Sequence, residues 1–117
     1  MIAKYLWIFL WFPICRINAQ CNETVFKINH GKLEKFSISG SYKGLVTEKV
    51  VDFDCDSQEI YVVKINGDVV RFSYSGQYKG LVTTKGNRIR VMGTILLVTK
   101  NNIIHKFDVS GRYLGAI

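Results

Sequence analysis

One segment occurs three times in this chain. Residues 36–46, FSISGSYKGLV, agree at nine of eleven positions with residues 72–82, FSYSGQYKGLV. A looser copy, FDVSGRYLGAI, spans residues 107–117. The three copies begin 36 and then 35 residues apart. A fixed period in this range is typical of repeat architectures, in which each unit buries its apolar face against its neighbours.

The same order of short elements leads into each copy. An apolar run of six residues comes first: ETVFKI, IYVVKI or ILLVTK. Such runs favour β-strands, since they are rich in β-branched and aromatic residues and too short for typical helices. Turns at 29–31, 66–68 and 100–102 supply Asn or Gly, which tolerate the positive φ of tight hairpins. We therefore expect each run to pair antiparallel with the strand that follows its turn.

A further strand precedes two of the units, VVDFDC at 50–55 and RIRVM at 88–92. Residues 48–83 and 84–117 are therefore each predicted to form a four-stranded meander, the size and make-up of a propeller blade. Residues 21–47 are predicted to form a partial blade that lacks its first strand. The predicted fold class is all-β, with antiparallel four-stranded meanders stacked as a partial β-propeller.

The middle unit, IYVVKINGDVVRFSYSGQYKGLV, resembles the NHL repeat and the broader group of six-bladed β-propellers. The likeness extends over most of residues 22–117. The residues that occupy the motif positions are Ile60, Val62, Asn66, Gly67, Phe72, Gly76 and Tyr78. The resemblance implies a radial arrangement of blades around an axis.

The number of blades is the main problem that the sequence raises. It supplies about 2.75 blades, whereas propellers usually close with four to eight. Three explanations are open: a fragment of a longer propeller, two or more chains that complete one ring by self-association, or an open stack.

The first twenty residues differ from the repeats. Lys4 precedes a mostly apolar run at 5–15, which is too short to cross a bilayer comfortably. We predict a signal peptide at 1–20, cleaved after Ala19 or Gln20, with an uncleaved anchor as the alternative. The chain is then exported, to the periplasm, the cell surface or the medium. Cleavage lowers the formal charge from +7 to +5, and without a dense basic run no nucleic-acid partner is expected.

Cleavage would leave two of the three cysteines, Cys21 and Cys55. In an oxidising compartment such a pair is a candidate disulfide. The alternative is two unrelated free thiols.

Two sets of side chains recur at equivalent repeat positions, and each has a binding and a structural interpretation. The basic set could attract an anionic glycan or membrane, or could be a solvated strand face. The aromatic set could form a platform for a sugar or peptide, or could pack within each blade. The two sets are Lys35, Arg71 and Lys106, and Tyr42, Tyr78 and Tyr113.

One acidic cluster, Asp52, Asp54, Asp56 and Glu59, invites comparison with a Ca²⁺ site, but no Gly follows to make the sharp turn of an EF-hand. We predict no metal ligand, no cofactor and no catalytic residue. The function predicted is that of a non-enzymatic interaction module for a protein or glycan, with the protein or glycan unidentified. The alternative is a metal-dependent hydrolase or lyase of the six-bladed propeller type, active only in a completed ring.

Overall fold

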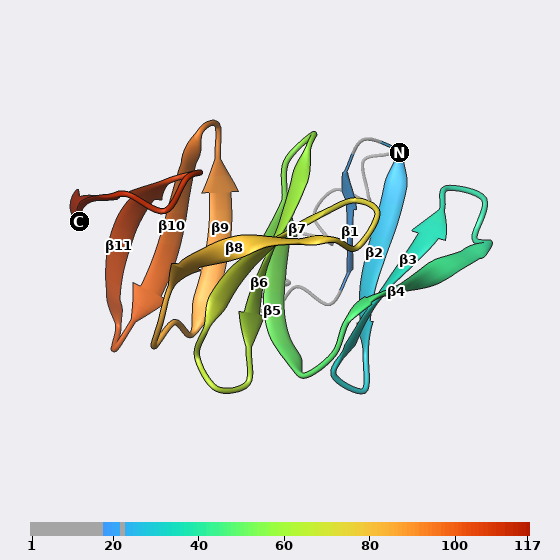
Figure 1. Ribbon diagram of the computed structural model, residues 1–117, viewed down its shortest axis with the longest axis horizontal. Helices are drawn as coiled ribbons and strands as arrows, with labels where there is room; N and C mark the ends of the chain where they lie inside the picture. Colours follow the sequence, from blue (N-terminus) through green and yellow to red (C-terminus); the bar gives the residue numbers. More distant parts are fainter. Residues whose placement is uncertain (1–17, 22) are drawn as a thin grey trace, which may run out of the picture.

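The computed structural model describes residues 18–21 and 23–117 and contains three antiparallel sheets (Figure 1). Each sheet has four strands, and the strands lie in the order in which they occur along the chain. Within the described residues no helix is long and apolar enough to cross a membrane. The three four-stranded antiparallel sheets confirm the predicted all-β fold of stacked meanders. We call the three sheets blades 1, 2 and 3.

Each blade runs from an inner to an outer strand. Blade 1 consists of β1 (Asn18–Cys21), β2 (Thr24–Asn29), β3 (Lys32–Ser37) and β4 (Tyr42–Thr47). Blade 2 consists of β5 (Val50–Cys55), β6 (Glu59–Lys64), β7 (Val69–Ser73) and β8 (Tyr78–Thr83). Blade 3 consists of β9 (Arg88–Met92), β10 (Ile95–Lys100), β11 (Ile103–Asp108) and β12 (Tyr113–Ala116).

The first strand of blade 1 corrects one expectation. Blade 1 was expected to have three strands, but β1 pairs antiparallel with β2, from Asn18 opposite Lys27 to Cys21 opposite Thr24. The segment carries no alternation of apolar residues, so only its pairing with the free edge of β2 identifies it as a strand. Three of its four residues belong to the predicted signal peptide, and residues 1–17 of that prediction lie outside the described residues.

The Ser-Gly turn of each repeat has one hydrogen-bonding pattern. The residue after the anchor Phe, which is Ser37, Ser73 or Asp108, accepts a side-chain hydrogen bond from the backbone N–H four residues later, at 2.9 to 3.1 Å. Its carbonyl also accepts the N–H of the turn glycine. That glycine has φ between +94° and +99° in all three copies, a conformation that favours Gly. The motif therefore encodes the turn between the third and fourth strands.

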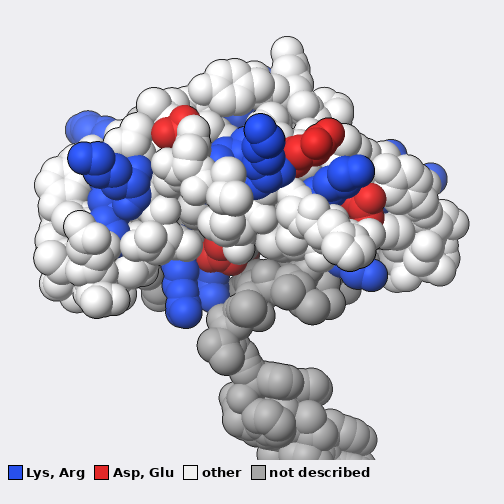
Figure 2. Space-filling model, turned by 90° about the horizontal axis from the view of Figure 1, so that it is seen from below, with Lys and Arg blue, Asp and Glu red and all other residues white. Residues whose placement is uncertain are grey.

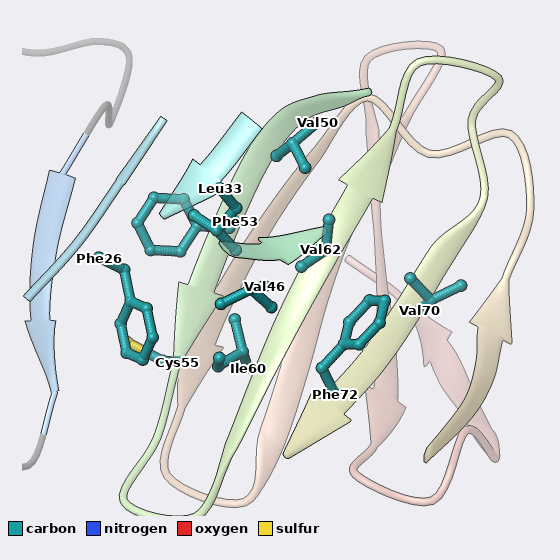
Figure 3. Close-up of a cluster of buried hydrophobic side chains, with 10 residues drawn as sticks. All are labelled: Phe26, Leu33, Val46, Val50, Phe53, Cys55, Ile60, Val62, Val70 and Phe72. Atoms are coloured by element: carbon teal, nitrogen blue, oxygen red, sulfur yellow. The ribbon is translucent and has the colours of Figure 1, made fainter. Parts of the chain in front are cut away.

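The core lies between the blades. Side chains alternate along each strand, so the two faces of blade 2 pack against different neighbours. Figure 3 shows the cluster that joins blades 1 and 2, in which Phe26 of β2 lies 6.3 Å from Phe53 of β5, ring centre to ring centre. A second cluster joins blades 2 and 3 and contains Tyr61, Val63, Val69, Val82, Ile89, Leu96, Val98 and Phe107.

The three blades are arranged side by side, with blade 2 in the middle (Figure 1). The inner strand β5 lies next to β9, and β2 lies next to β5. The described part of the chain measures 41 × 31 × 25 Å along its principal axes. Blade 2 is therefore the only blade here with a described neighbour on both faces.

Candidate binding surface

The recurring basic residues join neighbouring blades. Lys35 Nζ of blade 1 donates to the Tyr74 carbonyl of blade 2 at 2.6 Å. Arg71 Nη1 of blade 2 donates to the Val109 carbonyl of blade 3 at 2.7 Å. The two acceptors are equivalent, since each lies two residues after an anchor Phe. Both bases are half-buried, so neither matches the freely solvated row that the sequence suggested.

Lys106 of β11, the third member of the basic set, is half-buried, and its side chain makes no hydrogen bond or ion pair to any residue that the structure describes. Basic side chains elsewhere are also dispersed: on the face that Figure 2 shows, they form separate groups interspersed with acidic and uncharged surface. The structure thus contains no continuous basic stripe on this face.

The recurring tyrosines remain exposed while their rings are held in place. Tyr42, Tyr78 and Tyr113 each begin an outer strand and are between 53% and 58% exposed. Each ring packs edge-on against the anchor Phe of its own blade, with centroids 5.4 to 5.8 Å apart. The structural and the binding interpretation are therefore compatible, because one side of the ring is packed and the other faces solvent.

The exposed apolar surface continues along the same strands. Leu45 of β4, Leu81 of β8 and Leu114 of β12 are all exposed, as is Ile38 in the turn before β4. We call the three tyrosines and these three leucines the outer row. The tyrosines occupy the same repeat position in all three blades, as do Leu45 and Leu81 in two of them, whereas Leu114 directly follows Tyr113, at the position that Lys43 and Lys79 take in the other blades.

Two of the acidic residues in the predicted cluster are buried and support the neighbouring blade. Asp52 Oδ2 accepts the backbone N–H of Ile89 at 3.0 Å, and Asp54 Oδ2 accepts that of Val91 at 2.8 Å. Arg90 Nη1 lies 3.3 Å from Asp52 Oδ2. Both carboxylates are thus directed from β5 to β9. Sequence reasoning missed this role, although their period-2 spacing places both on one face of the strand.

Asp56 organises the loop after β5. Its Oδ1 accepts the backbone N–H of Gln58 and of Glu59, each at 2.8 Å, and its Oδ2 accepts the Tyr61 hydroxyl. Burial raises the pKa of Tyr61, and the hydrogen bond to Asp56 raises it further. Burial likewise raises the pKa of Tyr74 to about 12, with a smaller contribution from the charge of Asp56. Among the described residues no group of three or more His, Cys, Asp or Glu has the geometry of a metal site.

A second repeated contact links the blades near the hairpins. Lys64 Nζ donates to Thr47 Oγ1 of blade 1, and Lys100 Nζ donates to Thr83 Oγ1 of blade 2, both at 2.6 Å. Burial lowers the pKa of Lys64. Lys64 also lines a surface hollow of about 460 Å³ together with Lys49, Asn66, Asp68 and Tyr78. The spacing of 36 residues in both Lys64/Lys100 and Thr47/Thr83 is the sequence signal for this contact.

Cys21 and Cys55 are joined by a disulfide in the structure, with Cα atoms 6.2 Å apart. Cys21 ends β1 and Cys55 ends β5, so the bond connects the inner strands of blades 1 and 2. It supplements the hydrogen bonds and the apolar cluster across the same interface.

Comparison with known proteins supports the fold but does not assign a family. No protein-family model matches the chain, and no curated protein sequence matches it. The structure is similar to the crystal structure of the N-terminal domain of Nup159, with a TM-score of 0.65 at 11% sequence identity. The match covers 91% of this chain and 30% of that one. Since that domain is a β-propeller, the likeness shows a propeller-like fold, and at this identity it shows the fold alone.

Proposed function

We propose that this chain is an exported, non-enzymatic interaction module built from NHL-like blades, and that it binds a protein or glycan through the outer row. The observation that carries the proposal is the equal exposure of Tyr42, Tyr78 and Tyr113. Each of the three rings is held by an anchor Phe, so binding would restrict little further side-chain motion.

The chemistry of the outer row suits an extended ligand. A tyrosine ring offers an apolar surface and a hydroxyl, which together can pack against a sugar ring or a peptide side chain and donate a hydrogen bond. Lys43 and Lys79 follow two of the tyrosines and are exposed, which adds attraction for acidic groups. Repetition of the tyrosine on three blades provides equivalent contacts to one long ligand or to a large partner surface.

Other features favour an interaction module over an enzyme. Asp52 and Asp54 hold the backbone of β9, and Asp56 holds its own loop and Tyr61. These three carboxylates belong to the acidic cluster that the sequence offered for comparison with a metal site, and all of them make structural contacts. Export is supported by the apolar segment at 5–15 and by the disulfide between Cys21 and Cys55.

Binding can be tested with the secreted chain on a glycan array and a panel of extracellular proteins. We expect one ligand class whose affinity falls at least about fivefold in Tyr78→Ala, since truncating a central aromatic residue commonly costs more than about 1 kcal/mol. Tyr78→Phe preserves the ring and should retain most of the binding to any ligand that stacks on it. Ile65→Asp, an exposed change in the same blade but outside the outer row, is the matched control.

Undiminished binding by a folded Tyr78→Ala protein would refute the role of the outer row.

Export is tested separately by N-terminal sequencing of the secreted product, which should begin at Gln20 or Cys21. An intact N-terminus on a cytoplasmic product would contradict the export proposal. The start site also determines how much of β1 is retained.

A further inference from the structure

Each blade has a forward face, which points to the next blade along the chain, and a rear face, which points to the preceding one. The forward faces of blades 1 and 2 are covered by their successors. Strand register defines the equivalent positions: Leu33, Val69 and Ile104 each pair with the second strand of their own blade at the same site. The forward face of blade 3 is formed by Leu97, Thr99, Ile104, Lys106 and Ile117.

The positions of Ile104 and Ile117 are apolar in all three blades but buried in only two. Leu33 and Val69 are fully buried, whereas Ile104 is 37% exposed. Val82 is also buried, whereas Ile117 at the equivalent position is 74% exposed. The sequence of blade 3 therefore retains side chains suited to an interface that no described residue covers.

The basic residue before the anchor Phe can be compared between blades in the same way. Lys35 and Arg71 occupy its equivalent positions, and each donates to the backbone carbonyl two residues after the anchor Phe of the next blade. Lys106 has no such acceptor among residues 18–21 and 23–117. The donor that connects each blade to its successor is thus present on blade 3 without a described successor.

The rear face of blade 1 carries the matching features. Val25 and Phe36 are only half-buried, although the equivalent Ile60 and Phe72 lie in the core. The carbonyl of Ile38 is the equivalent of the two acceptors, because it also lies two residues after an anchor Phe. The stack therefore has a donor face at one end and an acceptor face at the other that no described residue covers.

The space around the turn glycine also differs between blade 1 and the other two blades. A β-carbon placed on Gly76 or Gly111 would lie 3.8 or 3.5 Å from a carbonyl oxygen of the preceding blade, that of Leu45 or Leu81. A β-carbon on Gly40 would have no atom of the described residues within 4 Å beyond its chain neighbours. The turn that approaches the preceding blade in blades 2 and 3 is open in blade 1.

We propose that a second copy of this chain places the rear face of its blade 1 on the forward face of blade 3, with Lys106 donating to the Ile38 carbonyl. Two copies joined in this way form two identical contacts related by a twofold axis and make one ring of six blades. Six lies within the usual range of four to eight, and closure covers both open faces. This inference concerns assembly and does not depend on the ligand proposed for the outer row.

The hydrogen bonds that join the inner strands β5 and β9 cannot be repeated in the proposed contact. The positions of Asp52 and Asp54, which accept N–H groups of β9, are taken by Arg88 and Arg90 in β9 itself. Arginine cannot accept a hydrogen bond. The proposed contact therefore consists of β10, β11 and β12 of one copy against β2, β3 and the following turn of the other.

The first test is the molar mass of the full secreted chain, measured by light scattering over a range of concentrations. We expect a single species of twice the mass of one chain. Ile104→Asp should convert it to a monomer, and Lys106→Met should raise the dimer dissociation constant at least about tenfold by removing a charged donor. Ile65→Asp, the same substitution at an exposed site in blade 2, should leave the dimer intact.

A mixing experiment tests the head-to-tail arrangement and controls for loss of folding. Ile104→Asp alters only the forward face of blade 3, and Val25→Asp alters only the rear face of blade 1. Each should be monomeric alone, and a mixture should form a heterodimer through the one contact in which both faces are intact. Circular dichroism should show β-structure in both variants.

Three outcomes would overturn the proposal. These are a wild-type monomer at every concentration, a series of masses that rises without limit, and a dimer that Ile104→Asp does not dissociate. A mixture of folded variants that stays monomeric would exclude the pairing of these two faces.

Discussion

At the scale of single residues, the buried acids show how polar groups join the blades. Asp52 and Asp54 are 7% exposed, yet each accepts a backbone N–H from β9. Burial of a carboxylate is unfavourable unless hydrogen bonds compensate it, and here the bonds also satisfy N–H groups at the edge of another sheet. The two residues therefore stabilise the interface between blades 2 and 3.

Asp54→Ala should lower the free energy of unfolding by about 1 to 3 kcal/mol, because it leaves the N–H of Val91 without this acceptor. Urea unfolding would show a lower midpoint with an unchanged slope. Glu48→Ala, an exposed acid in the connection before β5, should change stability by no more than about 0.5 kcal/mol. Equal effects of the two substitutions would refute the role of Asp54.

Tyr74 makes the free energy of unfolding depend on pH in the alkaline range. Its hydroxyl donates to the Asp56 carbonyl, and its pKa is about 12, against 10.0 for an ordinary tyrosine. The unfolded chain thus loses its phenolic proton first as the pH rises. Stability is full below about pH 10 and falls as the pH approaches the pKa of the folded state.

Tyr74→Phe should make the loss of stability above pH 10 less steep, and it should lower stability at neutral pH because the hydrogen bond to Asp56 is removed. Some alkaline loss should remain, since burial also raises the pKa of Tyr61. Urea unfolding at several pH values checks both effects. The same pH dependence in both proteins would contradict the assignment.

At the scale of elements, identical motifs occupy different environments. Phe36 and Phe72 begin nearly identical segments and pair with their second strands in the same register. Phe72 lies in the core between blades 1 and 2, whereas Phe36 is half-buried on the rear face of blade 1, which no described blade covers. The position of a repeat within the stack therefore determines the contribution of its anchor residue.

Phe72→Ala should destabilise the protein by about 3 to 5 kcal/mol, the range for truncating a buried Phe. In the monomeric Ile104→Asp background, where no second copy covers the rear face of blade 1, Phe36→Ala should have a clearly smaller effect, because part of its ring contacts solvent. The two variants are each other's control, and both can be compared by thermal or urea unfolding. A larger effect at Phe36 would mean that the rear face of blade 1 is covered in solution.

At the scale of the whole molecule, covalent and non-covalent contacts hold the stack together. Blades 1 and 2 share an apolar cluster, the hydrogen bond from Lys35 to Tyr74 and the disulfide from Cys21 to Cys55. Blades 2 and 3 share an apolar cluster and the bonds from Arg71, Asp52 and Asp54. The described interfaces are thus similar in apolar content but only the first has a covalent link.

Removing the disulfide should lower the free energy of unfolding by about 3 to 4 kcal/mol in the chain-entropy model, given a separation of 34 residues. Comparison of Cys55→Ser with the oxidised wild type measures this effect. Thiol reductant should destabilise the wild type and leave Cys55→Ser unchanged. Insensitivity of the wild type to reductant would indicate that the bond does not form.

Much of the fold was predictable from the sequence. The repeat period, the β-rich runs and the turn residues predict the strands of blades 2 and 3 and their antiparallel order, because these depend on local preferences and strand pairing. β1 was not predictable, since its residues lack a strand pattern and only the free edge of β2 explains their conformation. The candidate site was predicted in part: the tyrosines are exposed as one interpretation required, but two of the three bases bridge the blades.

The sequence alone determined the unit of structure, because spacing, alternation and turn chemistry are properties of neighbouring residues. The tertiary structure decided which copy of each repeated side chain is buried, bonded or exposed. Leu33, Val69 and Ile104 share one repeat position, but only the first two have a described blade in front of them. Burial depends on contacts between blades that are distant in sequence, and a repeated residue does not specify whether its blade has a neighbour on each face.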